Sequence, residues 1–313
     1  MRIAIVASFA VVNAGAARAQ SVRLADSLLR AGHLARAESL YYAATRNRPS
    51  DPVARKALGD FLVARGAPRV GATLLEEAIR FGGDRAAIER DLEPVYLSME
   101  DYHLLAALMS TPPADRDRAK WLIAHETRTI APDSMVSIAF HGSPDTSVIG
   151  HLQLRVDGRT LDATVSTRAR GLVISEGAVS PLHLHVFPGP SSGSHGSGIL
   201  AAADSVSIGA LSMRNVPVSI ARLDGKETAA VGIDMLGRFA PTFDARTQRV
   251  TLRASGSVTT AAGDTLETLQ HGAEVEVLRD GAWSPLGSES IMNSLRDHRW
   301  TFDAKHGRIV VER

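Results

Sequence analysis

The sequence contains no cysteine, few aromatic residues and almost no net charge. The absence of cysteine excludes disulfides, thiolate metal ligands, a cysteine nucleophile and a lipid-modified N-terminal cysteine. Aromatic residues make up 5% of the chain, so any stacking platform for bases or sugars would be small. The formal net charge of +1 gives no electrostatic basis for nucleic acid as a partner. We therefore expect no cofactor, no metal and no nucleic-acid partner.

What is present is the composition of an ordinary globular protein. Hydrophobic residues make up 44% of the 313 residues and charged residues 22%. This composition excludes a mainly disordered chain and a multi-spanning membrane protein. At roughly 100–200 residues per domain, the length predicts two or three domains.

The first 19 residues have the pattern of a cleavable export signal. Met1 and Arg2 form a short basic start, and residues 3–17 are apolar apart from one serine and one asparagine. Ala17-Arg18-Ala19 then provides the small-x-small sequence that a signal peptidase requires. The apolar run is too short to span a bilayer comfortably. We expect cleavage after Ala19 and release into a bacterial periplasm or the medium, with no membrane insertion afterwards.

Residues 20–129 show helical spacing that repeats every 34 residues. The first unit contains Leu24, Leu28, Gly32, Leu34, Ala37, Tyr41, Ala44 and Pro49, and the second Leu58, Leu62, Gly66, Pro68, Gly71, Leu75, Ala78 and Gly83. A weaker third unit contains Leu92, Tyr96, Tyr102 and Met109, and residues 115–128 are expected to form a capping helix. Small residues at matching positions allow paired helices to approach closely, and glycine suits the turn between them.

This pattern resembles the tetratricopeptide repeat. The resemblance implies an N-terminal α-solenoid whose concave groove binds a peptide or protein partner. A generic helical hairpin bundle, or an array that serves only as a spacer, remains the alternative.

After residue 130 the sequence pattern changes to short runs of alternating apolar and polar residues, rich in glycine, serine, threonine and valine. Strands are predicted over residues 136–141, 150–156, 160–165, 172–174, 205–208, 216–222 and 249–253. Three segments resemble those of a retropepsin-like aspartic peptidase and follow in the same order. Residues 156–175 resemble its hairpin and catalytic loop, residues 204–218 the segment after its flap, and residues 230–239 its apolar-apolar-Gly turn. The resemblance implies a retropepsin-like, acid-protease β-barrel domain over residues 130–255.

The catalytic loop departs from that family. Where the family has Asp-Thr-Gly-Ala-Ser, this chain has Ser166-Thr167-Arg168-Ala169-Arg170. An aspartic peptidase needs two carboxylates that share a proton, and a serine hydroxyl cannot replace one of them near neutral pH. The resemblance is thus to a degenerate member that has lost Asp-Thr-Gly. We assign no catalytic residue. The predicted binding cleft consists of Ser166, Thr167, Arg168, Arg170, Gly232 and His195, the last on the loop at the place of the flap.

Other acids and histidines do not supply a replacement. Asp162 precedes Ser166 by four residues, about 13 Å along a strand, which is too far for its carboxylate to stand in. Asp234 and Asp244 match structural acids of the family. His183, His185 and His195 could suggest zinc, but the surrounding loop is rich in glycine and serine and offers no acidic partner.

Residues 256–313 echo the end of the preceding domain. The segment Thr301–Val311 repeats Thr242–Leu252, and the residues before each segment are also alike. These residues are interpreted either as a truncated second half-lobe without a catalytic loop or as an unrelated β cap.

Taken together, the residues and both resemblances predict a multidomain α plus all-β protein that is exported and binds a peptide or protein partner without catalysis. Two alternatives stay open: an active aspartic-type endopeptidase that uses a non-standard acid or the Asp of a partner chain, and a structural component of an envelope assembly. A homodimer is possible, because retropepsin-like lobes often pair.

Overall fold

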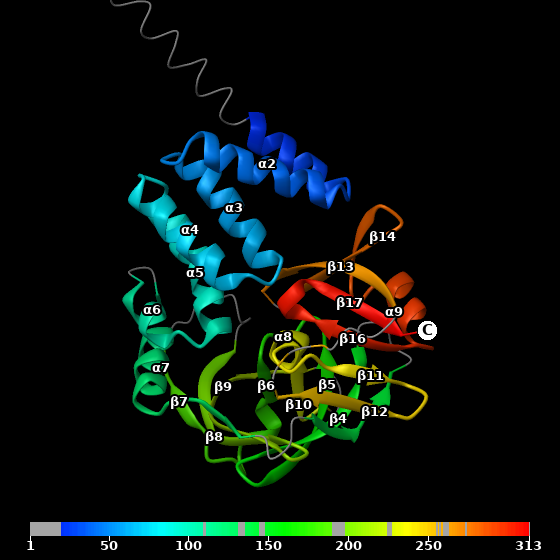
Figure 1. The fold of residues 1–313 in the computed structure, drawn as a ribbon. Coiled ribbons are helices and arrows are strands. Elements are labelled where there is room, and N and C mark those ends of the chain that lie inside the picture. The colour runs from blue at the N-terminus through cyan, green and yellow to red at the C-terminus, as the bar shows by residue number, and fades with distance from the viewer. Residues whose placement is uncertain are drawn as a thin grey trace, which may run out of the picture.

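The computed structural model describes residues 20–108, 111–130, 135–143, 148–189, 198–223, 227–254, 256, 258, 263–272 and 274–312. A helical N-terminal third lies along one side of a larger β-rich part (Figure 1). The predicted order of a helical region followed by a β-rich region is therefore confirmed. The predicted signal peptide and Met109 lie outside the described residues. Within those residues no helix is long and apolar enough to cross a membrane.

The helical region consists of antiparallel helices that recur at the predicted period. They are a helix over residues 20–30, α2 (Leu34–Asn47), α3 (Pro52–Ala64), α4 (Pro68–Arg80), α5 (Arg85–Met99), α6 (Tyr102–Ala107) and α7 (Pro113–Ala124). Helices α2, α4 and α6 begin 34 residues apart. Gly32 and Gly66, in the turns before α2 and α4, have φ angles of +75° and +82°, a region that favours glycine. The assignment to the tetratricopeptide repeat itself stays a prediction.

Close packing explains the small residues of the repeat. A Cβ atom built on Gly71 of α4 would lie 2.7 Å from the carbonyl oxygen of Gly59 of α3, so the two backbones approach where only glycine fits. Tyr41 fills the space between helices with 3% of its surface exposed, and its hydroxyl donates to Asp26 Oδ1 at 2.6 Å. The capping helix is shorter than predicted. It ends at Ala124, and residues 128–130 instead pair with a strand of the β-rich part.

The first sheet closes on itself. Its strands are β1 (Arg128–Ile130), β3 (His141–Gly142), β4 (Val148–Val156), β5 (Arg159–Ser166), β6 (Leu172–Ser175), β7 (His185–Phe187), β8 (Ile199–Ile208), β9 (Leu211–Ala221) and β10 (Ala229–Gly232). The order β9-β6-β10-β5-β4-β8 is completed by pairing of β8 with β9, which makes a six-stranded barrel. Alternating apolar side chains of these strands fill its interior, as in β4, where Leu152, Leu154 and Val156 are buried.

The second sheet has eight antiparallel strands and runs across the boundary predicted at residue 255. Its order is β15 (Ala282–Pro285), β14 (Glu274–Arg279), β13 (Gly263–His271), β17 (Arg308–Glu312), β16 (Arg299–Asp303), β11 (Thr242–Asp244), β12 (Arg249–Arg253) and β2 (Met135–Ala139). Two short helices, α8 (Ile233–Gly237) and α9 (Glu289–Leu295), precede β11 and β16. One hydrophobic core includes the barrel and this sheet.

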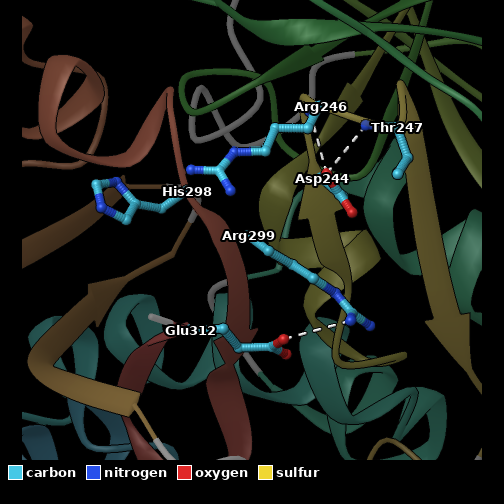
Figure 2. A pocket seen from close by; sticks show the side chains of 6 residues that line it. All are labelled: Asp244, Arg246, Thr247, His298, Arg299 and Glu312. Atoms are coloured by element: carbon cyan, nitrogen blue, oxygen red, sulfur yellow. Dashed lines mark hydrogen bonds and ion pairs between the residues drawn. The ribbon is translucent and has the colours of Figure 1, made fainter.

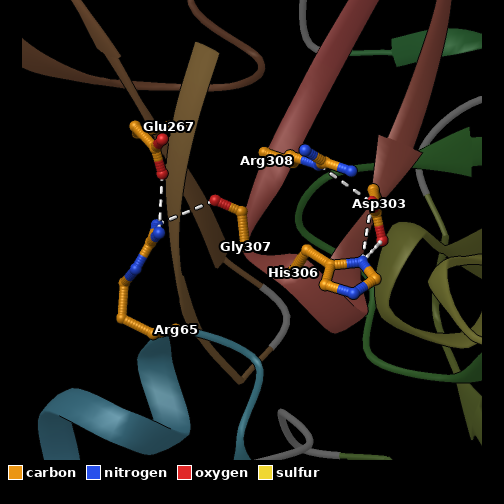
Figure 3. A network of polar contacts seen from close by, with 6 residues as sticks. All are labelled: Arg65, Glu267, Asp303, His306, Gly307 and Arg308. Carbon is orange, nitrogen blue, oxygen red and sulfur yellow. Dashed lines mark hydrogen bonds and ion pairs between the residues drawn. The ribbon is translucent and has the colours of Figure 1, made fainter. Parts of the chain in front are cut away.

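The helical region is anchored to the C-terminal strands, a contact that the sequence did not reveal. Arg65 donates from Nη1 to the carbonyl oxygens of Thr268 and Gly307, each at 2.8 Å, and from Nη2 to Glu267 Oε2 at 2.6 Å (Figure 3). Beside this contact, Asp303 is fully buried and accepts from the His306 ring and from Arg308 Nε. The Trp283 indole donates to the carbonyl of Leu29 at 2.6 Å. At the other end of the array, α7 packs against β7, β8 and β9.

Candidate functional site

The loop of residues 166–171 lies at the end of β5, beside the end of β10. The parallel pairing of these strands places Ser166 opposite Gly232, so two of the predicted cleft residues are neighbours in space. The Gly232 N–H donates to the carbonyl oxygen of Gly171 at 2.7 Å, which ties the far end of the loop to β10. Ser166 is half-buried, Thr167 is buried and Arg168 is exposed.

The Ser166 hydroxyl closes the loop in the manner of a short acidic side chain. Its oxygen accepts hydrogen bonds from the backbone N–H of Arg168 at 3.0 Å and of Ala169 at 3.1 Å. Serine and aspartate both make such local bonds to residues two and three positions ahead. The turn is therefore closed by a serine, whose hydroxyl carries no negative charge that could activate water.

Asp234 holds the other end of the loop. Both of its carboxylate oxygens accept from the Gly171 N–H at 3.1 Å, and Oδ1 also accepts from the Met235 N–H at 2.8 Å. Burial raises the pKa of Asp234, while these hydrogen bonds and the charge of Arg170 act against that rise without cancelling it. The carboxylate is thus used in positioning the loop, as expected for a structural acid.

Glycine is required at position 232 because the end of β10 lies very close to the loop of residues 166–171. A Cβ atom built there would collide with Asp234 Oδ1 and with the Ala169 carbonyl, whose carbon would be 3.1 Å away. We predict that Gly232→Ala lowers the free energy of unfolding by about 1–3 kcal/mol, because backbone must move to relieve the collision. Chemical denaturation would measure the loss. Gly177→Ala, where a Cβ meets nothing within 4 Å, should leave the midpoint unchanged; an equal loss in both variants would contradict this explanation.

Arg170 meets the C-terminal part of the chain. A Cβ atom on Gly272, in the turn after β13, would lie 2.7 Å from Cζ of Arg170, so the missing side chain leaves room for the guanidinium group. The Arg170 Nη1 atom is buried and has no hydrogen-bond partner within the described residues. The sequence pointed to Arg170 but not to Gly272, because 102 residues separate them and no local pattern indicates the contact.

The remaining candidates lie apart from this loop. Asp162 is exposed and accepts from Gln153 Nε2 across β4 and β5. His185 stacks on Trp121 of α7, with ring centroids 5.1 Å apart. His195 lies outside the described residues. Within the described ranges, no group of three or more histidine, aspartate or glutamate side chains could hold a metal ion.

A cavity of about 520 Å³ lies on the second sheet rather than at the loop (Figure 2). It is lined by Asp244, Arg246, Thr247, His298, Arg299 and Glu312. Burial acts to raise the pKa of Asp244, but hydrogen bonds from Thr247 and Arg246 and the nearby Arg299 outweigh it, so the pKa is lowered. Arg299 pairs with Glu312 at 3.3 Å. The charges in this cavity therefore largely offset each other, and Asp244 acts as the cap of its own turn.

The two repeated segments face each other in the second sheet. Thr242 of β11 pairs with its counterpart Thr301 of β16, and their hydroxyl oxygens are 2.7 Å apart. Next to β11 lie β12 and then β2, and next to β16 lie β17 and then β13. The six strands are thus arranged about a local twofold axis, which favours the half-lobe interpretation over an unrelated cap. In residues 263–312, as far as the structure describes them, no strand and loop correspond to β5 and residues 166–171.

Comparisons with known proteins find similarity among solved structures. No family model and no curated protein matches the chain. Among solved structures, the chain is similar to a retropepsin-like aspartic protease from Rickettsia conorii, with 18% sequence identity over 41% of this chain and 93% of that chain and a TM-score of 0.29.

Proposed function

We propose that this chain is an exported, non-catalytic relative of retropepsin-like aspartic peptidases that binds a peptide or protein partner at the loop 166–171. The observation that carries the proposal is the hydrogen bonding of the Ser166 hydroxyl. Its hydroxyl oxygen accepts two backbone N–H groups and keeps the loop in shape, yet it cannot share a proton with a second acid. The loop keeps a defined shape but lacks a carboxylate at position 166. Such a loop is better suited to binding a peptide than to hydrolysing one.

The described part of the C-terminal segment supports the same proposal. The C-terminal half-lobe, within its described residues, has no counterpart of the loop that would carry one. A second copy of the chain cannot supply it by extending the sheet at β11, because β11 already pairs with β12 on one edge and with β16 on the other. The helical array, fixed beside the β-rich part through Arg65 and Trp283, provides further surface for the partner.

The proposal is tested by incubating the chain from Gln20 to Arg313 with denatured casein between about pH 3 and 7, with and without pepstatin. We expect no cleavage above the buffer control. The double variant Ser166→Asp, Arg168→Gly should also remain inactive, because it restores only one of two acids. Pepstatin-sensitive cleavage by the unmodified chain would overturn the proposal. Cleavage by the double variant alone would contradict only the claim that a second acid is missing.

A further inference from the structure

The loop 166–171 carries two arginines on a backbone that is held in place at both ends. Ser166 accepts from two N–H groups at its start, and Gly171 donates to Asp234 and accepts from Gly232 at its end. A loop tied in this way holds the backbone of Arg168 and Arg170 in nearly fixed positions. Fixed positions reduce the entropy that a binding site loses when a ligand arrives.

Within the described residues these arginines have no direct ion-pair partner, although Arg170 interacts at longer range with the buried carboxylate of Asp234. Neither Arg168 nor Arg170 forms an ion pair among the described residues, and the buried Nη1 of Arg170 has no hydrogen-bond partner there. Asp234 uses its oxygens on the N–H groups of Gly171 and Met235 rather than on the guanidinium group. A buried donor without an acceptor is unfavourable, and an incoming acceptor would relieve it.

The turn after β13 borders this guanidinium group without neutralising it. Gly272 contributes only backbone beside Arg170, and Glu276 of the same hairpin lies 3.8 Å from His271. The guanidinium group of Arg170 therefore lies between the loop and the C-terminal hairpin and fills the space that a side chain at position 272 would need.

We propose that Arg168 and Arg170 form a recognition site for a carboxylate side chain, so that the bound partner is an acidic peptide segment; this inference rests on the proposed function. Arginine binds carboxylates through paired N–H···O bonds in a planar fork, a geometry that a single ammonium group does not provide. Two arginines thus stand two and four positions after Ser166, which occupies the position of the catalytic acid in the resembled family, and their charge suits an acid on the partner.

Fluorescence anisotropy with labelled hexaglutamate and hexaglutamine tests the inference. We expect hexaglutamate to bind at least about tenfold more tightly than hexaglutamine at about 0.05 M salt, with the difference reduced at about 0.5 M. Arg168→Ala and Arg170→Met should each weaken hexaglutamate binding by about tenfold, because each removes charge-assisted hydrogen bonds. Arg159→Ala, an exposed arginine at the other end of β5, should change it less than about twofold.

Circular dichroism establishes that each variant is folded, and if Arg170→Met is not, the exposed Arg168 decides the outcome. Equal binding of both peptides, or hexaglutamate binding unaffected by both substitutions, would overturn the inference. A pool of random-sequence peptides separates this failure from that of the proposed function. Retention of pool peptides without acidic preference rejects only the acidic-peptide site, whereas retention of no peptide rejects peptide binding altogether.

Discussion

Deleting residues 256–313 is expected to abolish cooperative folding of the β-rich part. The deletion removes β13 to β17, so β11 loses the strand on one of its edges. It also removes nine members of the main core: Val275, Val277, Leu286, Ile291, Met292, Leu295, Trp300, Phe302 and Ile309. Each buried side chain of this kind contributes about 1.5–3 kcal/mol, so their loss reaches or exceeds the net stability of about 5–15 kcal/mol of a typical domain.

The measurement compares thermal unfolding of residues 20–255 with that of residues 20–313. We expect a sigmoidal near-ultraviolet transition only in the longer chain, with aggregation or a featureless melt in the shorter one. The helical array should keep its far-ultraviolet signal in both, since its own hydrophobic clusters lie within residues 22–122. A sharp transition of the same midpoint in the shorter chain would mean that the segment is an independent cap.

Phe302→Ala is expected to lower the free energy of unfolding by about 3–5 kcal/mol, the cost of a cavity left by a large core side chain. Phe302 is fully buried, and its ring packs against α8, where a Cβ on Gly237 would lie 2.9 Å from Cε1. The contact joins residues on the two sides of position 255. Urea denaturation measures the loss.

Phe81→Ala is the matched control for this substitution. Phe81 is 44% exposed at the end of α4, and its ring lies under the Arg55 guanidinium at 4.9 Å. Its loss should cost about 1 kcal/mol or less. If Phe302→Ala cost no more than Phe81→Ala, residues 256–313 would not share the core of the barrel.

The sequence anticipated the local elements well, because local periodicity determines them. The 34-residue period predicted where helices recur, and Gly32 and Gly66 marked turns that have positive φ. Alternation predicted β4, β5 and β12 within two residues of their observed ends. These features depend on side-chain spacing and turn chemistry over a few residues, which can be read from a single sequence.

Contacts between residues far apart in the chain could not be predicted from local spacing. The pairing of β11 with β16, the contact of Arg65 with β13 and the short strand β1 join residues far apart in the chain. No local pattern distinguishes Arg65 from the other arginines of the array. The repeat of Thr242–Leu252 in Thr301–Val311 related residues 256–313 to the preceding domain, but it left the symmetric arrangement of the strands undetermined.

The sequence indicated some residues of the candidate site but not the contacts that they make with distant parts of the chain. The family resemblance placed Ser166 and Gly232 in one predicted cleft, and the register of β5 and β10 places them side by side. The assignment of Asp234 as a structural acid agrees with its hydrogen bonds to Gly171 and Met235. The turn at Gly272 escaped prediction, because a contact that depends on the absence of a side chain leaves no positive pattern in the sequence.

The most direct test of the account is to incubate the chain from Gln20 to Arg313 with a complex peptide mixture and analyse both the retained and the unbound peptides by mass spectrometry. The account predicts that peptides rich in aspartate and glutamate are retained intact, and that no new termini appear in either fraction. New termini that pepstatin suppresses would contradict it, and would mean that the loop of Ser166 belongs to a working peptidase.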